Sequence, residues 1–178
     1  MRESEPSLLR RYFAGLAEHT FLTELGLADP PLVDYLSDLL ARFARYDAIY
    51  RLRDLAGRRL EEVAQMMVEA QERVGEARRE VHRHIGDFTL FWAGVYPEAL
   101  RCLQRTDTAD HLLDYCQQGK RAYWIASLIE TDSEDEAPCP LLERLSLQFE
   151  LCAYGLGEVR RSWERGDGEG LGRPYLIN

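Results

Sequence analysis

The part of the sequence best suited to chemistry is the stretch HRHIGDFTLFWAGVYPE, which occupies residues 82–98 after a densely charged segment. Within it, His84 lies one helical turn after Glu80 and three residues before Asp87. On a helix these three side chains share one side, whereas His82 points about 200° away from His84. Carboxylates and imidazoles at this spacing can exchange a proton or bind a transition metal, so the stretch is a candidate site.

A metal site is the sharper interpretation of this spacing. Helical bundles bind two metal ions through Glu-x-x-His on two helices and one Glu from each of two others. The sequence has no Glu-x-x-His, and Glu18 and His19 are adjacent, so they diverge by about 100° on a helix. We therefore keep Glu80, His84 and Asp87 as an alternative metal set, and we predict no metal and no cofactor.

A structural interpretation gives the polar residues of the stretch positions at helix ends. Asp87 can cap the N-terminus of a new helix, with Gly86 at the break. Pro97 and Glu98 can begin the following helix, with an acid near the positive end of the helix dipole. An isolated buried carboxylate is costly and needs a donor. We therefore predict that Asp87 is structural, holding a helix start or bonding to His84.

The elements that must position these residues are predicted to be helices. Apolar residues recur at alternating steps of three and four from Leu60 to Phe88, which predicts one long helix. Similar steps predict a helix over 108–129 and a last long helix over 142–163, and Asp29 with two following prolines predicts an earlier helix start. The two long seams consist of Leu60, Val63, Met67, Ala70, Val74, Ala77, Val81, His84 and Phe88, and of Leu142, Leu145, Phe149, Cys152, Leu156, Val159 and Trp163.

This pattern predicts an all-α fold, an antiparallel helical bundle of about five to seven helices that cross at roughly 18–20°. We expect one helical domain over 1–164 and a glycine-rich C-terminal tail over 165–178. Segment 50–59 alternates like a short strand, but Gly57 between two helical patterns favours a turn between helices. Five acids over 130–136, followed by two prolines, predict a solvated loop.

Composition limits the partners and the compartment. The net charge is −9, which argues against the clustered basic face of a nucleic-acid-binding protein. The longest apolar run, over 88–96 apart from Thr89, is shorter than the roughly 20 residues of a membrane span, and the N-terminus has no apolar signal core. None of the four cysteines forms Cys-x-x-Cys. We expect a cytoplasmic protein with no nucleic-acid and no membrane partner, and its single lysine among 22 basic residues is typical of a GC-rich bacterial genome.

Two segments, GDFTLFWAGVYPE at 86–98 and YCQQGKRAY at 115–123, carry a recurring pattern. It consists of Gly-Asp, Leu-Phe, Gly and Pro-Glu, then Tyr, Gly-Lys and Ala-Tyr. The pattern resembles that of a bacterial all-helical family of unknown function. The resemblance is confined to these segments and implies a helical fold and a region of interest, with no activity attached. The residues that carry it are Gly86, Asp87, Leu90, Phe91, Gly94, Pro97, Glu98, Tyr115, Gly119, Lys120, Ala122 and Tyr123.

Two functional hypotheses follow. The preferred one is a protein-interaction or structural module that forms a homodimer and can also bind another protein, because two seams and three tryptophans exceed what one small bundle easily buries. The alternative is a small-ligand- or metal-binding protein, enzymes included, although no nucleophile or phosphate-loop motif marks a reaction. Its site would lie near the junction of 80–98 and 115–123 and would consist of His84, Asp87, Glu98, Lys120 and Tyr123. Convergence of these five side chains on one pocket favours the alternative, and their pairing as caps and ion pairs favours the interaction module.

Overall fold

The computed structural model describes residues 5–134 and 136–166, and this part of the chain is all-α. It contains nine α-helices, more than the five to seven expected, because two have only four residues and two predicted helices are each divided. Among the described residues there is no strand, and one isolated bridge joins Arg53 to Arg59. The helices are α1 (Glu5–Glu18), α2 (Pro30–Phe43), α3 (Tyr46–Ile49), α4 (Val63–Glu72), α5 (Gly75–Gly94), α6 (Leu100–Leu103), α7 (Tyr115–Ser127), α8 (Cys139–Leu147) and α9 (Phe149–Gly166), with a π-helix η1 (His19–Glu24) and a 3-10 helix η2 (Pro97–Ala99).

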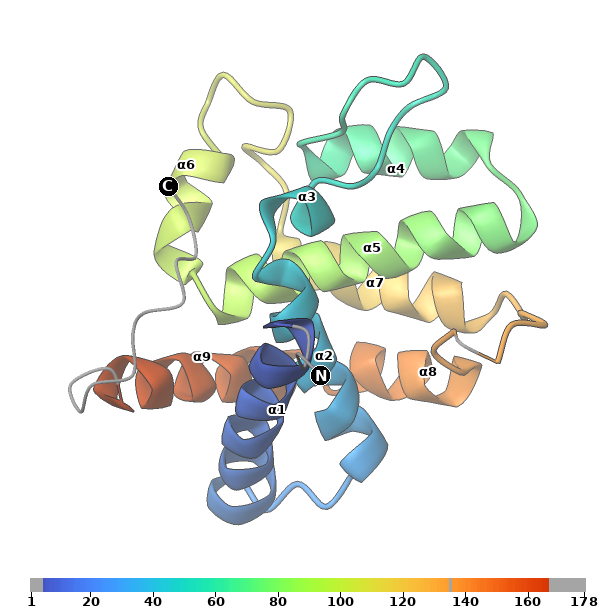
Figure 1. Ribbon diagram of the computed structural model, residues 1–178. Helices are drawn as coiled ribbons and strands as arrows, with labels where there is room; N and C mark the ends of the chain where they lie inside the picture. The colour runs from blue at the N-terminus through green and yellow to red at the C-terminus, as the bar shows by residue number, and fades with distance from the viewer. Residues whose placement is uncertain (1–4, 135, 167–178) are drawn as a thin grey trace.

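The long helices are arranged around α5, which crosses the middle of the molecule (Figure 1). α4 and α7 both pack against α5 and run antiparallel to it, and α8 packs against α7 on the side away from α4. α1 and α2 pack against each other and cross α5 and α9 steeply. The aligned antiparallel arrangement that the sequence predicts therefore describes α4, α5, α7 and α8–α9, but not the N-terminal pair.

The start of α2 follows the sequence prediction. The Asp29 carboxylate accepts a hydrogen bond from the backbone amide of Leu32 at 3.3 Å, and Pro30 and Pro31 occupy the first turn. The same carboxylate accepts two hydrogen bonds from Arg144 of α8, at 2.7 and 3.2 Å. The cap thus also ties α2 to the C-terminal helices.

The prediction of one helix over 60–88 is wrong. The seam is shared by α4 and α5, which are antiparallel and joined by a reversal at Gly75, where φ is +58°. Glycine adopts this left-handed conformation without the steric cost that a Cβ imposes. Val74, a predicted seam residue, is exposed at the reversal. α5 then continues without interruption to Gly94, so the helix break predicted at Gly86 is also wrong.

The two C-terminal predictions are correct in type and differ in extent. α7 begins at Tyr115 instead of residue 108, with Asp114 capping it through the Gln117 amide, and Leu112 lies exposed before it. The segment predicted as one helix over 142–163 is divided into α8 and α9 at Gln148. Every residue of the seam predicted for this segment is nevertheless buried, so the apolar spacing identified the correct face.

The connections match the predicted turn and loop. Segment 50–59 joins α3 to α4 as a turn, with Gly57 at a φ of +81° and a 3.1 Å hydrogen bond from the Leu60 amide to the Leu52 carbonyl. The acidic segment 130–136, of which residue 135 is not described, joins α7 to α8 outside any helix.

Two further expectations concern membranes and the tail. No helix within residues 5–134 and 136–166 is long and apolar enough to cross a membrane. α9 ends at Gly166, and the rest of the glycine-rich tail predicted over 165–178 lies outside the described residues.

Candidate functional site

Asp87 lies where α2, α5 and α7 meet, and its side chain is fully buried. Its Oδ1 accepts hydrogen bonds from the hydroxyls of Tyr35, at 2.6 Å, and Tyr123, at 2.7 Å. Its Oδ2 accepts a hydrogen bond from Nη2 of Arg42 at 3.1 Å. Tyr35 and Arg42 are two turns apart on α2, and Tyr123 belongs to α7. One carboxylate therefore joins three helices that the sequence places far apart.

The surroundings of Asp87 favour its charged form. Burial alone would raise the pKa of this carboxyl, but the charges of Arg42 and Arg83 and the two tyrosine hydroxyls hold the pKa below its ordinary value. The same burial, together with the Asp87 charge, raises the pKa values of Tyr35 and Tyr123 above their ordinary range. At neutral pH the cluster therefore holds one carboxylate, one guanidinium and two neutral phenols, and none of these groups is poised to exchange a proton.

His84 lies one turn before Asp87 on α5, and its ring is bound by other groups. Its Nε2 lies 2.9 Å from the Ile49 carbonyl oxygen, and its Nδ1 lies 3.3 Å from Nε of Arg51. Because a carbonyl only accepts and a guanidinium only donates, Nε2 carries the hydrogen and Nδ1 accepts. Burial, and then the Arg51 charge, lowers the pKa of His84 to about 4, so the ring is neutral at pH 7. Arg51 also pairs with Glu80 at 2.6 Å.

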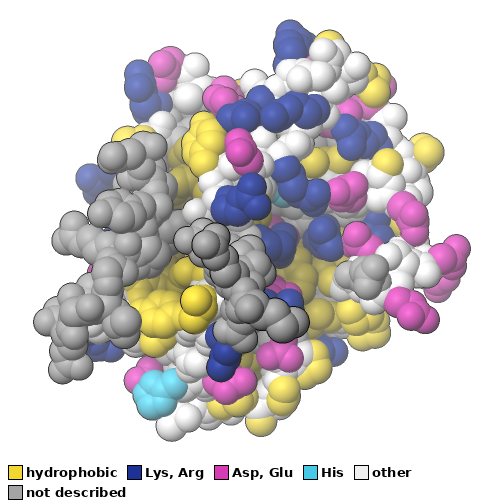
Figure 2. Space-filling model, in the orientation of Figure 1, with side chains coloured by type: hydrophobic (Ala, Val, Ile, Leu, Met, Phe, Trp, Pro, Cys, Tyr) yellow, Lys and Arg dark blue, Asp and Glu magenta, His cyan; other side chains and the backbone are white. Residues whose placement is uncertain are grey.

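The first half of α5 carries two further arginines toward the segment between α7 and α8. Arg79 is buried and donates hydrogen bonds to the carbonyls of Ile129 and Ala137. Arg79 and Arg83 share Glu136 as an ionic partner, at 3.4 and 2.7 Å. On the face seen in Figure 2, basic side chains gather around the middle, where α3 and α5 lie in Figure 1, with acidic side chains beside them. Hydrogen bonds and ion pairs of Arg79 and Arg83 thus connect this side of α5 to the segment between α7 and α8.

The five residues of the predicted ligand site do not share one pocket. Asp87 and Tyr123 are hydrogen-bonded, but His84 faces the Ile49 carbonyl and Arg51. The other two lie elsewhere and form ion pairs, Glu98 with Arg160 at 2.5 Å and Lys120 with Glu150 at 2.8 Å. This pairing is the outcome that favours the interaction module.

Two interpretations of Asp87 are corrected by these contacts. It does not cap a helix, because it lies inside α5, and its hydrogen bonds go to α2 and α7 instead of His84. The alternative metal set of Glu80, His84 and Asp87 does not assemble, because each side chain faces different partners. In the described ranges, no group of three His, Cys, Asp or Glu side chains is arranged to hold a metal ion.

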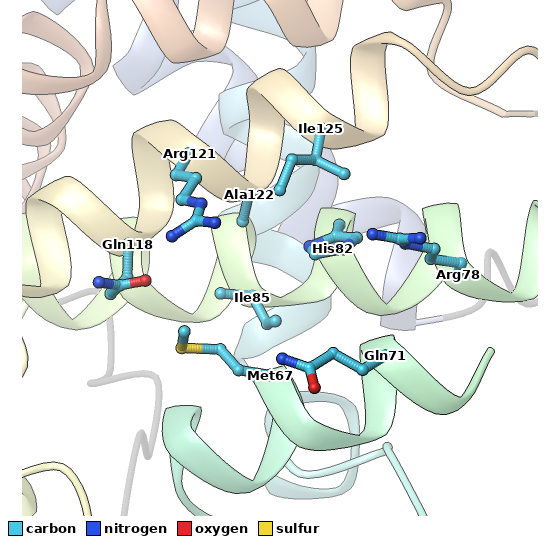
Figure 3. A pocket seen from close by; sticks show the side chains of 9 residues that line it. All are labelled: Met67, Gln71, Arg78, His82, Ile85, Gln118, Arg121, Ala122 and Ile125. Atoms are coloured by element: carbon cyan, nitrogen blue, oxygen red, sulfur yellow. The ribbon is translucent and has the colours of Figure 1, made fainter. Parts of the chain in front are cut away.

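A cavity of about 90 Å³ lies on the other side of α5, between α4 and α7 (Figure 3). His82 lines it with only 8% of its surface exposed, and its Nε2 has no hydrogen-bond partner among the described residues. Burial, and then the charges of Arg78 and Arg121, lowers the pKa of His82 to about 4. The cavity is lined by Met67, Gln71, Arg78, His82, Ile85, Gln118, Arg121, Ala122 and Ile125.

The sequence prediction missed most of these partners for a physical reason. Tyr35 and Arg42 lie 52 and 45 residues before Asp87, and a local spacing pattern carries no information on contacts at that separation. The cavity could have been found from helical spacing, because Arg78, His82 and Ile85 follow steps of four and three.

Comparison with protein-family models, with curated proteins and with solved structures finds no match to this chain. Its function must therefore be argued from its own surfaces and cavities.

Proposed function

We propose that this protein is an interaction module that forms a homodimer through the exposed apolar surface of α7, α8 and α9. The observation that carries the proposal is an apolar stripe of four large side chains that have no place in the core. Their exposed fractions are 42% for Trp124, 66% for Leu147, 38% for Leu151 and 57% for Tyr154.

Contacts of α7 with α8 and α9 bring these side chains onto one surface. The Ser146 hydroxyl donates to the Lys120 carbonyl at 2.7 Å, and the Lys120 ammonium pairs with Glu150 at 2.8 Å. Trp124 lies one helical turn after Lys120, while Leu147, Leu151 and Tyr154 lie three before, one after and four after Glu150. The stripe therefore lies around the Lys120–Glu150 pair on a surface formed by three helices, α7, α8 and α9.

The size of this stripe suits the centre of a dimer interface. At about 200 Å² for a large side chain, the four residues expose roughly 400 Å² of surface. A stable interface takes about 800 Å² from each partner and has an apolar core with a polar rim. The stripe supplies about half of that area, and the surrounding polar residues of α7 and α9 can supply the rest.

Charge also favours a second copy as the partner. The chain carries a net charge of −9, so two copies repel unless they meet at a neutral surface. The stripe encloses one lysine and one glutamate, the only lysine of the sequence among them. In a twofold dimer the same pair from each copy meets itself in reverse, and Lys120 of one copy can then pair with Glu150 of the other.

The helical seams themselves are not part of this surface. The seam over 142–163 is buried within one chain. Leu156, for example, has no exposed surface and packs beside Gly94 of α5. The apolar surface that remains for association is thus the outer side of the same C-terminal helices.

Sedimentation equilibrium on the full chain tests the proposal. We expect a dimer mass at tens of micromolar, and we expect the double variant Leu147→Glu/Tyr154→Glu to raise the dimer Kd at least about tenfold, because it buries uncompensated charge at the interface. Both sites are exposed, so thermal unfolding of the dissociated variant should remain cooperative.

Val68→Glu is the matched control, because Val68 is exposed on α4, which does not contribute to the stripe. It should leave the dimer mass unchanged. A monomer mass for the wild type, or an intact dimer in the double variant, would overturn the proposal. A second protein that binds the stripe of a monomeric wild type would also count against it.

A further inference from the structure

The cavity of Figure 3 is built by regularly spaced side chains of three helices. α4 contributes Met67 and Gln71 at a step of four, and α5 contributes residues 78, 82 and 85. α7 contributes residues 118, 121, 122 and 125, so each helix turns one consistent side toward the cavity. The lining contains no carboxylate, although acidic residues outnumber basic ones by 31 to 22 in the sequence.

Two guanidinium groups in this lining lack an anionic partner. Neither Arg78 nor Arg121 forms a side-chain hydrogen bond or an ion pair within residues 5–134 and 136–166. Their neighbours on the same helix sides explain this, because the residues three and four positions away are not acidic. Arg78 and Arg121 are themselves exposed, so they lie where the cavity opens to solvent, whereas the more buried Arg79 and Arg83 of α5 share Glu136 as a partner. The cavity therefore has unmatched positive charge.

The register of α5 and α7 separates the two guanidinium groups. A Cβ on Gly86 would lie 2.6 Å from the Tyr123 ring, and one on Gly119 would lie 2.3 Å from Oγ1 of Thr89. These contacts set Arg121 opposite residues 86–89, whereas the backbone of Arg78 lies roughly 12–16 Å earlier along α5. Figure 3 shows Arg121 and Arg78 toward opposite ends of the cavity, with Ile85 between them.

The remaining lining is suited to a short ligand with an apolar middle. Ile85 of α5 forms an apolar floor between Ala122 of α7 and Met67 of α4, and the amides of Gln71 and Gln118 lie at its margin. A volume of about 90 Å³ is roughly that of three liquid water molecules, which excludes a large ring system. His82 adds a neutral ring with one free nitrogen at the Arg78 end.

We propose that this cavity binds a short-chain dicarboxylate, with one carboxylate on Arg78, the other on Arg121 and the methylene chain over Ile85. Planar guanidinium groups bind carboxylates through paired hydrogen bonds, so two separated arginines select two separated carboxylates. A single carboxylate engages only one end of the cavity, and a compact anion such as phosphate has no group to cover the apolar floor. The site is separate from the α7–α9 stripe, so its test does not depend on dimer formation.

Titration of the ¹⁵N-labelled full chain, followed by amide chemical shifts, tests this site. The probes are malonate, succinate, glutarate, butyrate and inorganic phosphate at constant ionic strength. We expect saturable shifts in α4, α5 and α7, with one dicarboxylate length binding at least about tenfold more tightly than butyrate and phosphate. Arg78→Gln and Arg121→Gln should each weaken that dicarboxylate at least about tenfold.

Arg101→Gln is the matched control, because Arg101 is an exposed arginine of α6 that forms no ion pair with the described residues and does not line the cavity. It should leave the dicarboxylate Kd unchanged, and all three variants should keep the wild-type thermal midpoint. The proposal is overturned if no dicarboxylate saturates by about 10 mM. It is also overturned if butyrate or phosphate binds as tightly, or if Arg78→Gln and Arg121→Gln bind like the control.

Discussion

Asp87 carries its charge inside the core because it is matched by one guanidinium and two hydroxyl donors. Its Oδ1 accepts hydrogen bonds from Tyr35 on α2 and Tyr123 on α7, and its Oδ2 accepts one from Arg42 on α2. Removing one partner of a buried ion pair leaves the other charge without compensation, which costs more than the pair itself contributes. The residue therefore acts as a connection among helices.

Asp87→Asn should lower the free energy of unfolding by about 2–4 kcal/mol. The amide oxygen can still accept from both tyrosines, but the amide nitrogen then faces Nη2 of Arg42, donor against donor. Urea unfolding at pH 7 measures the change. Asp38→Asn is the control, because Asp38 pairs with Arg10 at the surface, and it should cost less than about 1 kcal/mol. Equal losses in the two variants would contradict a role for burial.

At this scale the sequence allows the role of Asp87 to be predicted, but not its partners. A carboxylate beside an apolar run needs donors wherever it lies, so a structural role follows from general energetics. The nearest donors along the chain suggested a helix cap, and the true donors come from segments 36 to 52 residues away. Only the tertiary fold brings such groups together, and no local spacing encodes it.

The contact between α5 and α7 depends on glycines that admit large side chains. Tyr123 packs over Gly86, and Thr89 and Phe149 pack over Gly119. This close approach lets the Tyr123 hydroxyl reach Asp87. The two segments that carry the family-like pattern, 86–98 and 115–123, therefore contain the two sides of one helix contact.

Gly119→Ala should destabilise the protein by about 1–3 kcal/mol, although alanine is the better helix former. Its Cβ would lie 2.3 Å from Oγ1 of Thr89 and 2.4 Å from Cε2 of Phe149, so α7 must move away from α5. Gly15→Ala is the matched control on α1, where no atom lies within 4 Å of the added Cβ. It should stabilise by up to about 1 kcal/mol in the same unfolding assay. A neutral or stabilising Gly119→Ala would contradict the close contact.

The start of α4 is satisfied from a distant part of the chain. Asp110 is buried and accepts hydrogen bonds from the backbone amides of Val63 and Ala64, both at 2.8 Å, and from the Tyr115 hydroxyl at 2.6 Å. Free amides at a helix start need such acceptors.

Asp110→Ala should lower the free energy of unfolding by about 1–3 kcal/mol, because it leaves buried amides and a hydroxyl unpaired. Hydrogen exchange should show faster opening of the first turn of α4. The control is Asp107→Ala, which removes a surface pair with Arg105 and should change stability by less than about 0.5 kcal/mol. Unchanged exchange in α4 would refute the capping role.

Elements were predictable where apolar spacing alone determines them, and less so where the backbone reverses. In the sequence, the heptad spacing continues without a gap from Ala70 to Val74 and beyond. The spacing therefore gives no sign of the chain reversal at Gly75, where α4 is followed by α5. The division of α8 from α9 at Gln148 carries no glycine or proline, and hydrogen bonds continue on both sides of it. Tertiary packing thus decides these boundaries, while the buried faces follow from the spacing except near the reversal, where the seam residues Val74 and Ala77 are exposed.

On the scale of the whole molecule, α5 carries two buried neutral histidines on opposite sides. His84 is hydrogen-bonded to the Ile49 carbonyl and to Arg51, and His82 lines the cavity between α4 and α7. Burial first, and then nearby arginines, lowers the pKa of each ring to about 4. In the unfolded chain both titrate near the ordinary histidine value of about 6.5.

This difference makes the global stability depend on pH. Between about pH 6.5 and pH 4 the unfolded chain binds protons at both histidines and the folded chain does not, so acidification favours unfolding. The contribution of each ring is therefore complete above pH 6.5 and declines as the pH falls toward 4, by up to about 3 kcal/mol. We expect urea midpoints at fixed protein concentration to fall steadily over this range.

His84→Gln, which can still donate to the Ile49 carbonyl, should have a lower midpoint at pH 7 and a shallower decline below pH 6.5. The control is His19→Gln, at the exposed first residue of η1, and it should retain the wild-type slope more fully than His84→Gln does. If His84→Gln and wild type decline in parallel, the folded protein must protonate His84 as readily as the unfolded chain does, and the hydrogen-bonded neutral ring is wrong.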